Sequence, residues 1–251
     1  MEIRKPNPFR EKQKEYRDVV FDNKNQVAFG VEWVIRVILI YTPWWFFPGN
    51  WIKAATDRPH IFVRRILIDI YVIAKVVISW GLITHQYADN WYVTLILVWL
   101  AIETIYALLG GVFLRDVWSE PFSYQRNLTL MLINYIEICL CFAAFYTFKE
   151  HQVNNAGRSL FVINDSLISA DKHLTSSQAI YFSFVTAATI GYGDISPKDE
   201  SIQHIVILQI MLSLSFIVMF IANVSGKLGT GAFAAASQNA SQTTPTEGPD
   251  G

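Results

Sequence analysis

The sequence is poor in charged side chains. Asp, Glu, Lys and Arg make up 16% of its 251 residues, whereas a soluble domain carries about a quarter. Apolar residues make up 52% and are gathered into long runs. This composition excludes an ordinary soluble domain and predicts an integral membrane protein surrounded by lipid. The net charge of −1 gives no reason to expect a nucleic-acid partner.

Cysteine and catalytic clusters are scarce as well. Cys139 and Cys141 stand two positions apart in an apolar run, and on a helix their side chains would point about 200° apart, which argues against a disulfide between them. The chain lacks His, Cys and carboxylate residues at metal-binding spacing, and it lacks a paired nucleophile and base. These absences argue against an enzyme. A secretory signal is not expected, because residues 1–26 are polar.

Four apolar runs are each close to the roughly 20 residues that a helix needs to cross a bilayer. They cover residues 66–84, 92–114, 128–148 and 202–224. A further run, 27–47, contains Glu32, Arg36 and an aromatic end, a pattern typical of an amphipathic helix lying in the membrane interface. Its length would also permit a span.

The positions of Lys and Arg decide between these two interpretations. If 27–47 stays at the interface, most Lys and Arg fall on the side of the N-terminus, which the positive-inside rule identifies as the cytoplasm. If it crosses, most of them fall outside. We therefore predict a cytoplasmic polar arm over 1–26, an interfacial helix over 27–47, and cytoplasmic N- and C-termini on a multi-pass protein of the plasma membrane. A role of the arm in binding a regulatory partner stays open.

The first two spans form a transmembrane hairpin within 48–114. Three ionisable residues are expected at similar depth inside the spans, namely Lys75, Glu103 and Glu137. A charge at the bilayer centre costs about 2.5–3.5 kcal/mol on insertion scales, so these side chains should face protein and pair with one another. An ion pair that fixes helix packing is favoured over a proton- or voltage-sensitive gate. Since no span repeats Arg or Lys at every third position, steep voltage gating is not expected.

The most informative stretch is 189–194, with the sequence Thr-Ile-Gly-Tyr-Gly-Asp. Glycine takes positive φ at little cost, so Gly191 and Gly193 allow successive carbonyl groups to point the same way, which a regular β-strand forbids. With the Thr189 hydroxyl at one end, the segment becomes a column of oxygen ligands. Such an environment suits a weakly hydrated cation.

A short helix is predicted just before this stretch, over 177–188, after N-cap candidates at 175–177. It is too short to cross a bilayer. Its C-terminal end carries partial negative charge, which would favour cations in front of it. The non-helical backbone that follows is tolerated at membrane depth only where it is buried in protein or lines water, as in a pore.

The stretch 189–194 resembles the selectivity-filter signature of potassium channels, in which backbone carbonyls replace the hydration shell of the ion. The resemblance runs from Ser176 through Ser225. It implies K⁺ as the permeant ion, no organic cofactor, and a homotetramer around a central pore, because one filter segment cannot enclose an ion. It also implies a pore domain over 115–226, which comprises an outer helix, a turret over 149–176, a pore helix over 177–188, the filter over 189–194 and an inner helix over 202–226.

The resemblance assigns roles to individual positions. The ion-binding carbonyls are those of Thr189, Ile190, Gly191, Tyr192 and Gly193, and Asp194 stands at the outer mouth. Support of the filter is assigned to Tyr181, Phe182 and Val185. Tyr192 is expected to point away from the pore and to brace the filter against Tyr181 and Phe182. Some relatives carry a glutamate where this chain has Val185, so Asp194 is expected to lack one common partner.

On the inner helix, Ser213 takes the position where a hinge glycine often stands. Three residues are expected near the cavity wall, namely Leu214, Ile217 and Ile221. The tail over 227–251 is small and polar and is predicted to be disordered.

The predicted function is therefore passive, potassium-selective conduction without strong voltage gating. Two alternatives stay open. A weakly selective monovalent cation channel is one, because some such channels also carry Ile-Gly-Tyr-Gly, although they often lose the acid that stands here as Asp194. A non-conducting regulatory or assembly subunit is the other, and the short helix and flanking spans around 189–194 argue against it. The gating stimulus is not given by the sequence.

Overall fold

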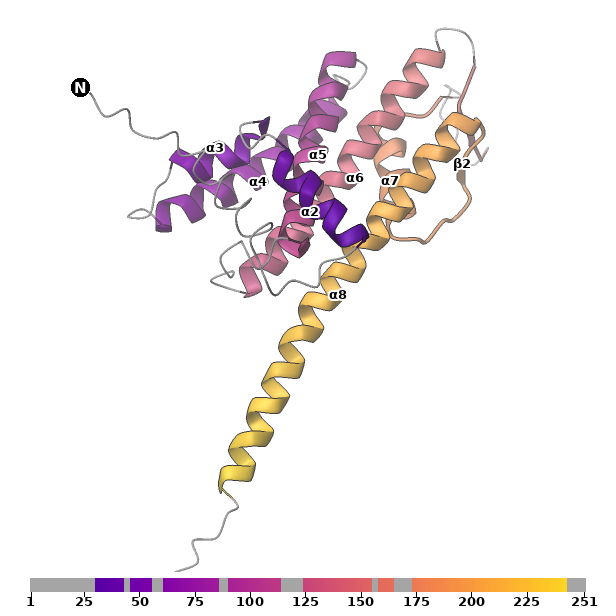
Figure 1. Ribbon diagram of the computed structural model, residues 1–251. Helices are drawn as coiled ribbons and strands as arrows, with labels where there is room; N and C mark the ends of the chain where they lie inside the picture. The colour runs from indigo at the N-terminus through magenta and orange to yellow at the C-terminus, as the bar shows by residue number, and fades with distance from the viewer. Residues whose placement is uncertain are drawn as a thin grey trace, which may run out of the picture.

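The computed structural model describes residues 30–42, 46–55, 61–85, 90–113, 124–154, 158–164 and 173–242. In these residues the chain forms seven helices and two short strands (Figure 1). Four of the helices are long and apolar enough to cross a membrane. The predicted all-α membrane architecture is therefore confirmed.

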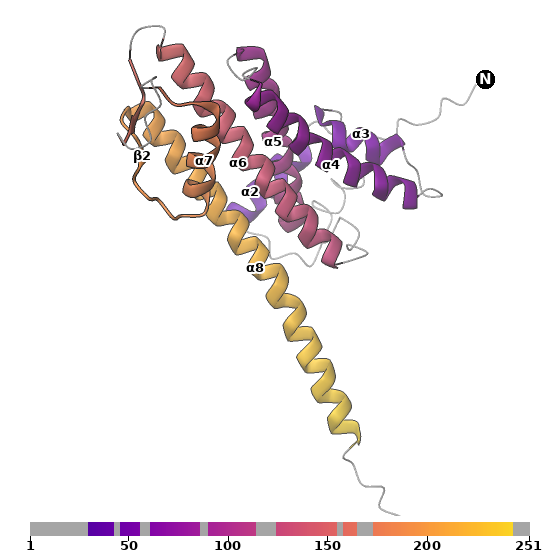
Figure 2. The same cartoon turned by 180° about the vertical axis from the view of Figure 1, so that it is seen from behind.

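The four long helices are α4 (Ile61–Thr84), α5 (Trp91–Phe113), α6 (Tyr124–Asn154) and α8 (Glu200–Gln242). Helices α4, α6 and α8 each contain one of the predicted apolar runs, and α5 covers the run 92–114 up to Phe113. Helix α6 is central: it packs against α4 and α5 on one side and against α7 (Ser176–Ala187) and α8 on the other, as the two opposite views show (Figures 1 and 2). The hairpin α4–α5 thus meets the part of the chain around 189–194 largely through α6.

The first two described helices, α2 (Val31–Tyr41) and α3 (Pro48–Ala55), have 11 and 8 residues and are too short to cross a bilayer. Helix α2 packs on α5, where the Tyr106 hydroxyl donates a 3.0 Å hydrogen bond to the Leu39 carbonyl. Its Glu32 and Arg36 form an i,i+4 ion pair of 3.0 Å. An interfacial location of α2 stays a prediction, and the arm over 1–26 lies outside the described residues.

Two features of the turret region differ from the prediction. Helix α6 continues to Asn154 instead of ending at 148, and strand β1 (Phe161–Ile163) pairs antiparallel with β2 (Ile195–Pro197), with Val162 opposite Ser196. A surface loop was expected here. The short ribbon was not predicted because strands of three residues carry no periodic signal.

The end of α8 also differs. The helix continues through Gly226 to Gln242 and projects well beyond the other helices (Figure 1). The prediction of disorder is therefore wrong for 227–242, and 243–251 lies outside the described residues. The run of alanines over 234–236 is a physical reason, because alanine has the highest helix propensity and offsets the glycines before it.

Candidate ion-binding site

Helix α7, which the sequence predicts to be the pore helix, begins with a capping box. The Gln178 amide donates to the Thr175 hydroxyl at 3.3 Å, while Gln178 Oε1 accepts from the Thr175 amide at 2.9 Å. Two backbone groups at the helix start are thus satisfied by side chains. The structure selects Thr175 as the N-cap among the three predicted candidates.

The same helix ends in a Schellman motif. The Ile190 amide donates to the Val185 carbonyl at 3.0 Å, and the Thr189 amide donates to the Thr186 carbonyl at 3.0 Å. Thr189 occupies the left-handed position of this motif with φ of 57°, where glycine is usual. A β-branched residue at positive φ is an outlier. Strain of this kind is found at functional sites, where the surrounding structure holds it.

The backbone after Thr189 alternates in handedness. The φ angles of Thr189, Gly191 and Gly193 are 57°, 57° and 77°, whereas Ile190 and Tyr192 between them do not have positive φ. In a β-strand, uniform negative φ makes carbonyls alternate in direction, and reversing every second residue turns successive carbonyls toward one side. The segment therefore has the backbone that a column of carbonyl ligands requires.

The predicted filter segment, 189–194, is open on one side of the chain. Ile190 and Tyr192 are 55% and 67% exposed, and a Cβ added to Gly191 or Gly193 would meet no atom within 4 Å. Contrary to the expectation, no ring contact joins Tyr192 to Tyr181 or Phe182 within the described residues of the chain. Phe182 is instead buried, edge-on to Tyr146 and Phe161, and the Tyr181 hydroxyl is bonded to Asp194.

Asp194 has the partner that the sequence analysis missed. The Tyr181 hydroxyl donates to Asp194 Oδ2 at 2.6 Å, and Oδ1 accepts from the Ile195 amide at 3.0 Å. The hydrogen bond to the carboxylate raises the pKa of Tyr181 to about 12, so this phenol stays protonated and donates at neutral pH. Val185, expected to support the filter, is half-buried and contributes its carbonyl to the end of α7.

The β1–β2 ribbon holds the Asp194 end of the predicted filter segment. The Asn164 amide donates to the Asp194 carbonyl at 2.9 Å, and the Lys198 amide donates to the Leu160 carbonyl at 2.8 Å. Since β2 begins directly after Asp194, the ribbon places the acid relative to the turret. The carbonyl of Asp194 is thereby used within the chain and does not extend the ligand column.

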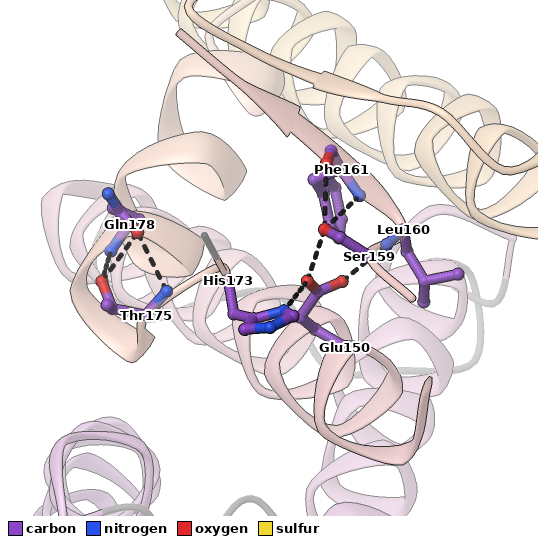
Figure 3. Close-up of polar contacts among 7 residues, drawn as sticks. All are labelled: Glu150, Ser159, Leu160, Phe161, His173, Thr175 and Gln178. Atoms are coloured by element: carbon purple, nitrogen blue, oxygen red, sulfur yellow. Dashed lines mark hydrogen bonds and ion pairs between the residues drawn. The ribbon is translucent and has the colours of Figure 1, made fainter. Parts of the chain in front are cut away.

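Glu150, near the end of α6, in turn holds the start of β1 (Figure 3). This glutamate is 2% exposed. Its Oε2 accepts from the Leu160 amide at 2.8 Å, and its Oε1 accepts from the Ser159 hydroxyl at 2.6 Å. Nδ1 of His173, which lies just before the pore-helix cap, is 3.4 Å from the same Oε1. Glu150 therefore joins the end of α6, the start of β1 and the segment before α7. This role was not predicted, because a lone glutamate after an apolar run has the sequence pattern of an ordinary surface residue.

Replacing Glu150 with leucine is expected to release β1. A hydrogen bond to a charged group is worth about 1.5–3 kcal/mol, so the Leu160 amide should exchange its hydrogen at least about tenfold faster. Hydrogen exchange of the peptide covering β1 measures this. The matched control is Glu200→Gln, since Glu200 is exposed in the first turn of α8. Equal protection of β1 in the Glu150→Leu variant and in the wild type would show that the carboxylate does not hold the strand.

The inner-helix candidates fall on two faces of α8. Leu214, Ile217 and Ile221 share one exposed face at helical spacing, whereas Ser213 is fully buried against the rest of the chain. The helix is continuous through Ser213, so no break marks the expected hinge position.

The intramembrane charges are arranged in two groups. Lys75 Nζ lies 2.8 Å from Glu137 Oε2, and the Thr104 hydroxyl accepts from Lys75 and donates to Glu137 at 2.6 and 2.7 Å. Glu103 does not join this pair, contrary to the expectation. It accepts instead from the Tyr71 hydroxyl at 2.5 Å and the Gly49 amide at 2.7 Å. Adjacent residues on a helix point about 100° apart, so Thr104 faces the pair and Glu103 does not.

A comparison with protein families bears on this site. Residues 130–229 match the family model described as Ion channel. The matched segment starts within α6, includes α7 and the predicted filter segment 189–194, and ends within α8, so it contains the whole candidate site. The match indicates an ion channel and covers less than half of the chain. No curated protein matches the chain.

Proposed function

We propose that this protein is a potassium-selective channel that conducts K⁺ passively across a membrane without strong voltage gating. The observation that carries the proposal is the alternating handedness of Thr189, Ile190, Gly191, Tyr192 and Gly193 directly after a short capped helix. Carbonyl oxygens aligned in this way replace the hydration shell of K⁺. Sites for divalent cations usually include carboxylates, and this column offers only neutral oxygens.

The proposed assembly is a homotetramer. The filter presents exposed Ile190 and Tyr192, and an apolar face of α8 is exposed along Leu208, Met211, Leu214, Val218 and Ile221. Closed cyclic symmetry would cover these surfaces and would bring four ligand columns to one axis. In such an assembly Tyr192 would pack against a neighbouring subunit instead of its own pore helix. In the tetramer, the face with Leu214, Ile217 and Ile221 would line the central cavity and contact the neighbouring subunits.

The test is a reversal potential measured across a bilayer containing the purified full chain, with K⁺ on one side and Na⁺ on the other. We expect a potential shifted by about 59 mV for every tenfold preference for K⁺. A reversal potential near zero would favour the weakly selective cation channel instead. The absence of current from correctly assembled protein would favour the non-conducting subunit.

Substituting Tyr181 with phenylalanine is expected to weaken the outer mouth without blocking conduction. The variant keeps the ring and removes the hydroxyl that Asp194 accepts. Because the pair is partly exposed, we expect a modest effect, with potassium current fading roughly three- to tenfold faster during sustained conduction. Macroscopic current decay measures this. Tyr92→Phe is the control, since Tyr92 is exposed at the start of α5. Identical decay in both variants would rule out the contribution of the Tyr181 hydroxyl.

A further inference from the structure

A buried glutamine ties the inner helix to the pore helix. Gln209 of α8 is fully buried, and its amide nitrogen donates to the carbonyl and the hydroxyl of Ser183 in α7 at 2.8 and 2.9 Å. Its amide oxygen accepts from the Tyr146 hydroxyl of α6 at 2.6 Å. Both ends of the side chain are therefore bonded.

The network continues into the outer helix. The Ser183 hydroxyl donates to the Cys139 carbonyl at 2.6 Å. Ser183 of α7 therefore forms hydrogen bonds with both α6 and α8. The Tyr146 ring is itself held edge-on by Phe161 and Phe182. A buried network with every member satisfied is rigid and specifies one arrangement of its elements.

Packing alone does not require glutamine at this position. The residues on either side of it in α8, Leu208 and Ile210, are apolar, and a buried amide is costly unless it is hydrogen-bonded. A methionine or leucine would fill a similar volume without that cost. The amide therefore specifies the helix packing, because its hydrogen bonds form in only one register of α8 against α7.

The location of the network gives this register a consequence for the filter. Ser183 lies six residues before Thr189, on the short helix whose Schellman end sets the first left-handed residue of the ligand column. Gln209 lies about one turn before Ser213 and Leu214 on α8. A shift of α8 along or around its axis would act directly on α7, and α7 ends where the column begins.

We infer that Gln209 is a positioning residue of the filter: by holding Ser183, it fixes α7 against α8 and keeps the inner end of the carbonyl column at the spacing that selects K⁺. This inference rests on the proposed function. Gln209 does not contact the ion path. It acts through the pore helix.

The experiment uses Gln209→Met in the reconstituted full chain, which keeps the volume and removes the hydrogen bonds. We expect conduction to persist while the permeability ratio of K⁺ to Na⁺ falls about tenfold, the equivalent of losing one to two buried hydrogen bonds. Ser183→Ala should lower the ratio in the same direction, and the double variant should lower it no further than Gln209→Met alone. The matched control is Gln125→Met, an exposed glutamine at the start of α6, which should leave the ratio unchanged.

The outcomes separate this inference from the function on which it rests. Absence of potassium selectivity in the wild type would overturn both. A selective wild type with an unchanged ratio in Gln209→Met would overturn the inference alone. If Gln209→Met does not assemble, Ser183→Ala and Tyr146→Phe are measured instead, since each removes one hydroxyl of the network. A lower permeability ratio in both variants supports the positioning role of Gln209. An unchanged ratio in both overturns it.

Discussion

A Gly191→Ala variant is expected to carry no measurable potassium current. Gly191 has φ of 57°, and an added Cβ would meet no atom of its own chain within 4 Å, so crowding within the chain is not the cause. The cause is the backbone, because a left-handed conformation costs an L-residue about 1–2 kcal/mol. In the proposed tetramer this cost arises four times around one axis. Relief by a return to negative φ would turn a carbonyl out of the column.

The control for this prediction is Gly111→Ala. Gly111 lies in α5, where an added Cβ also meets nothing within 4 Å, but its φ is not positive. Alanine is favoured over glycine in a helix, so this variant should conduct normally. Single-channel recording of both variants measures the difference. A Gly191→Ala protein with wild-type current and selectivity would show that the carbonyl column is not the ion path.

The second large effect is expected at the buried ion pair. Replacing Lys75 with methionine leaves Glu137, which is fully buried, without its counter-charge. Breaking a buried pair in this way costs about 3–5 kcal/mol, whereas replacing both partners by apolar residues is often close to neutral. We therefore expect Lys75→Met to lower the thermal stability strongly and Lys75→Met with Glu137→Met to recover most of it. Loss of helical circular dichroism on heating in detergent measures this.

The ion pair of α2 provides the comparison, because one of its partners is solvated. Glu32 is 47% exposed and pairs with Arg36 at i,i+4, and Glu32→Gln keeps an oxygen that can accept from Arg36, so this substitution should change stability much less than Lys75→Met. If Lys75→Met were as stable as the wild type but changed the fraction of time that the channel is open, the pair would be a gate and not a packing device. The Thr104 hydroxyl, which bonds both partners, makes the packing role the expected one.

The contacts of Glu103 and Asp194 that were not predicted share a physical cause. Glu103 was grouped with Lys75 and Glu137 by depth alone, and depth does not tell which way a side chain points around a helix axis. The partners of Glu103, Tyr71 and the Gly49 amide, lie on two other helices. The Tyr181–Asp194 hydrogen bond was not predicted either. The turn after α7 lies between the two residues, and its path decides whether their side chains meet.

The sequence by itself determined the features whose physics is local. Hydrophobic runs predicted the four long helices, because each segment must satisfy its own backbone in lipid. The glycines at 191 and 193 predicted carbonyls that point the same way, because glycine takes positive φ at little cost. The positive φ of Thr189 goes against local sterics and was not predicted. Only the tertiary structure decided which side chains hold that backbone in place. Gln209 meets Tyr146 across 63 residues, and Glu150 meets the strand that anchors Asp194. Such contacts depend on how helices rotate and pack against one another, which periodicity in a single chain does not record.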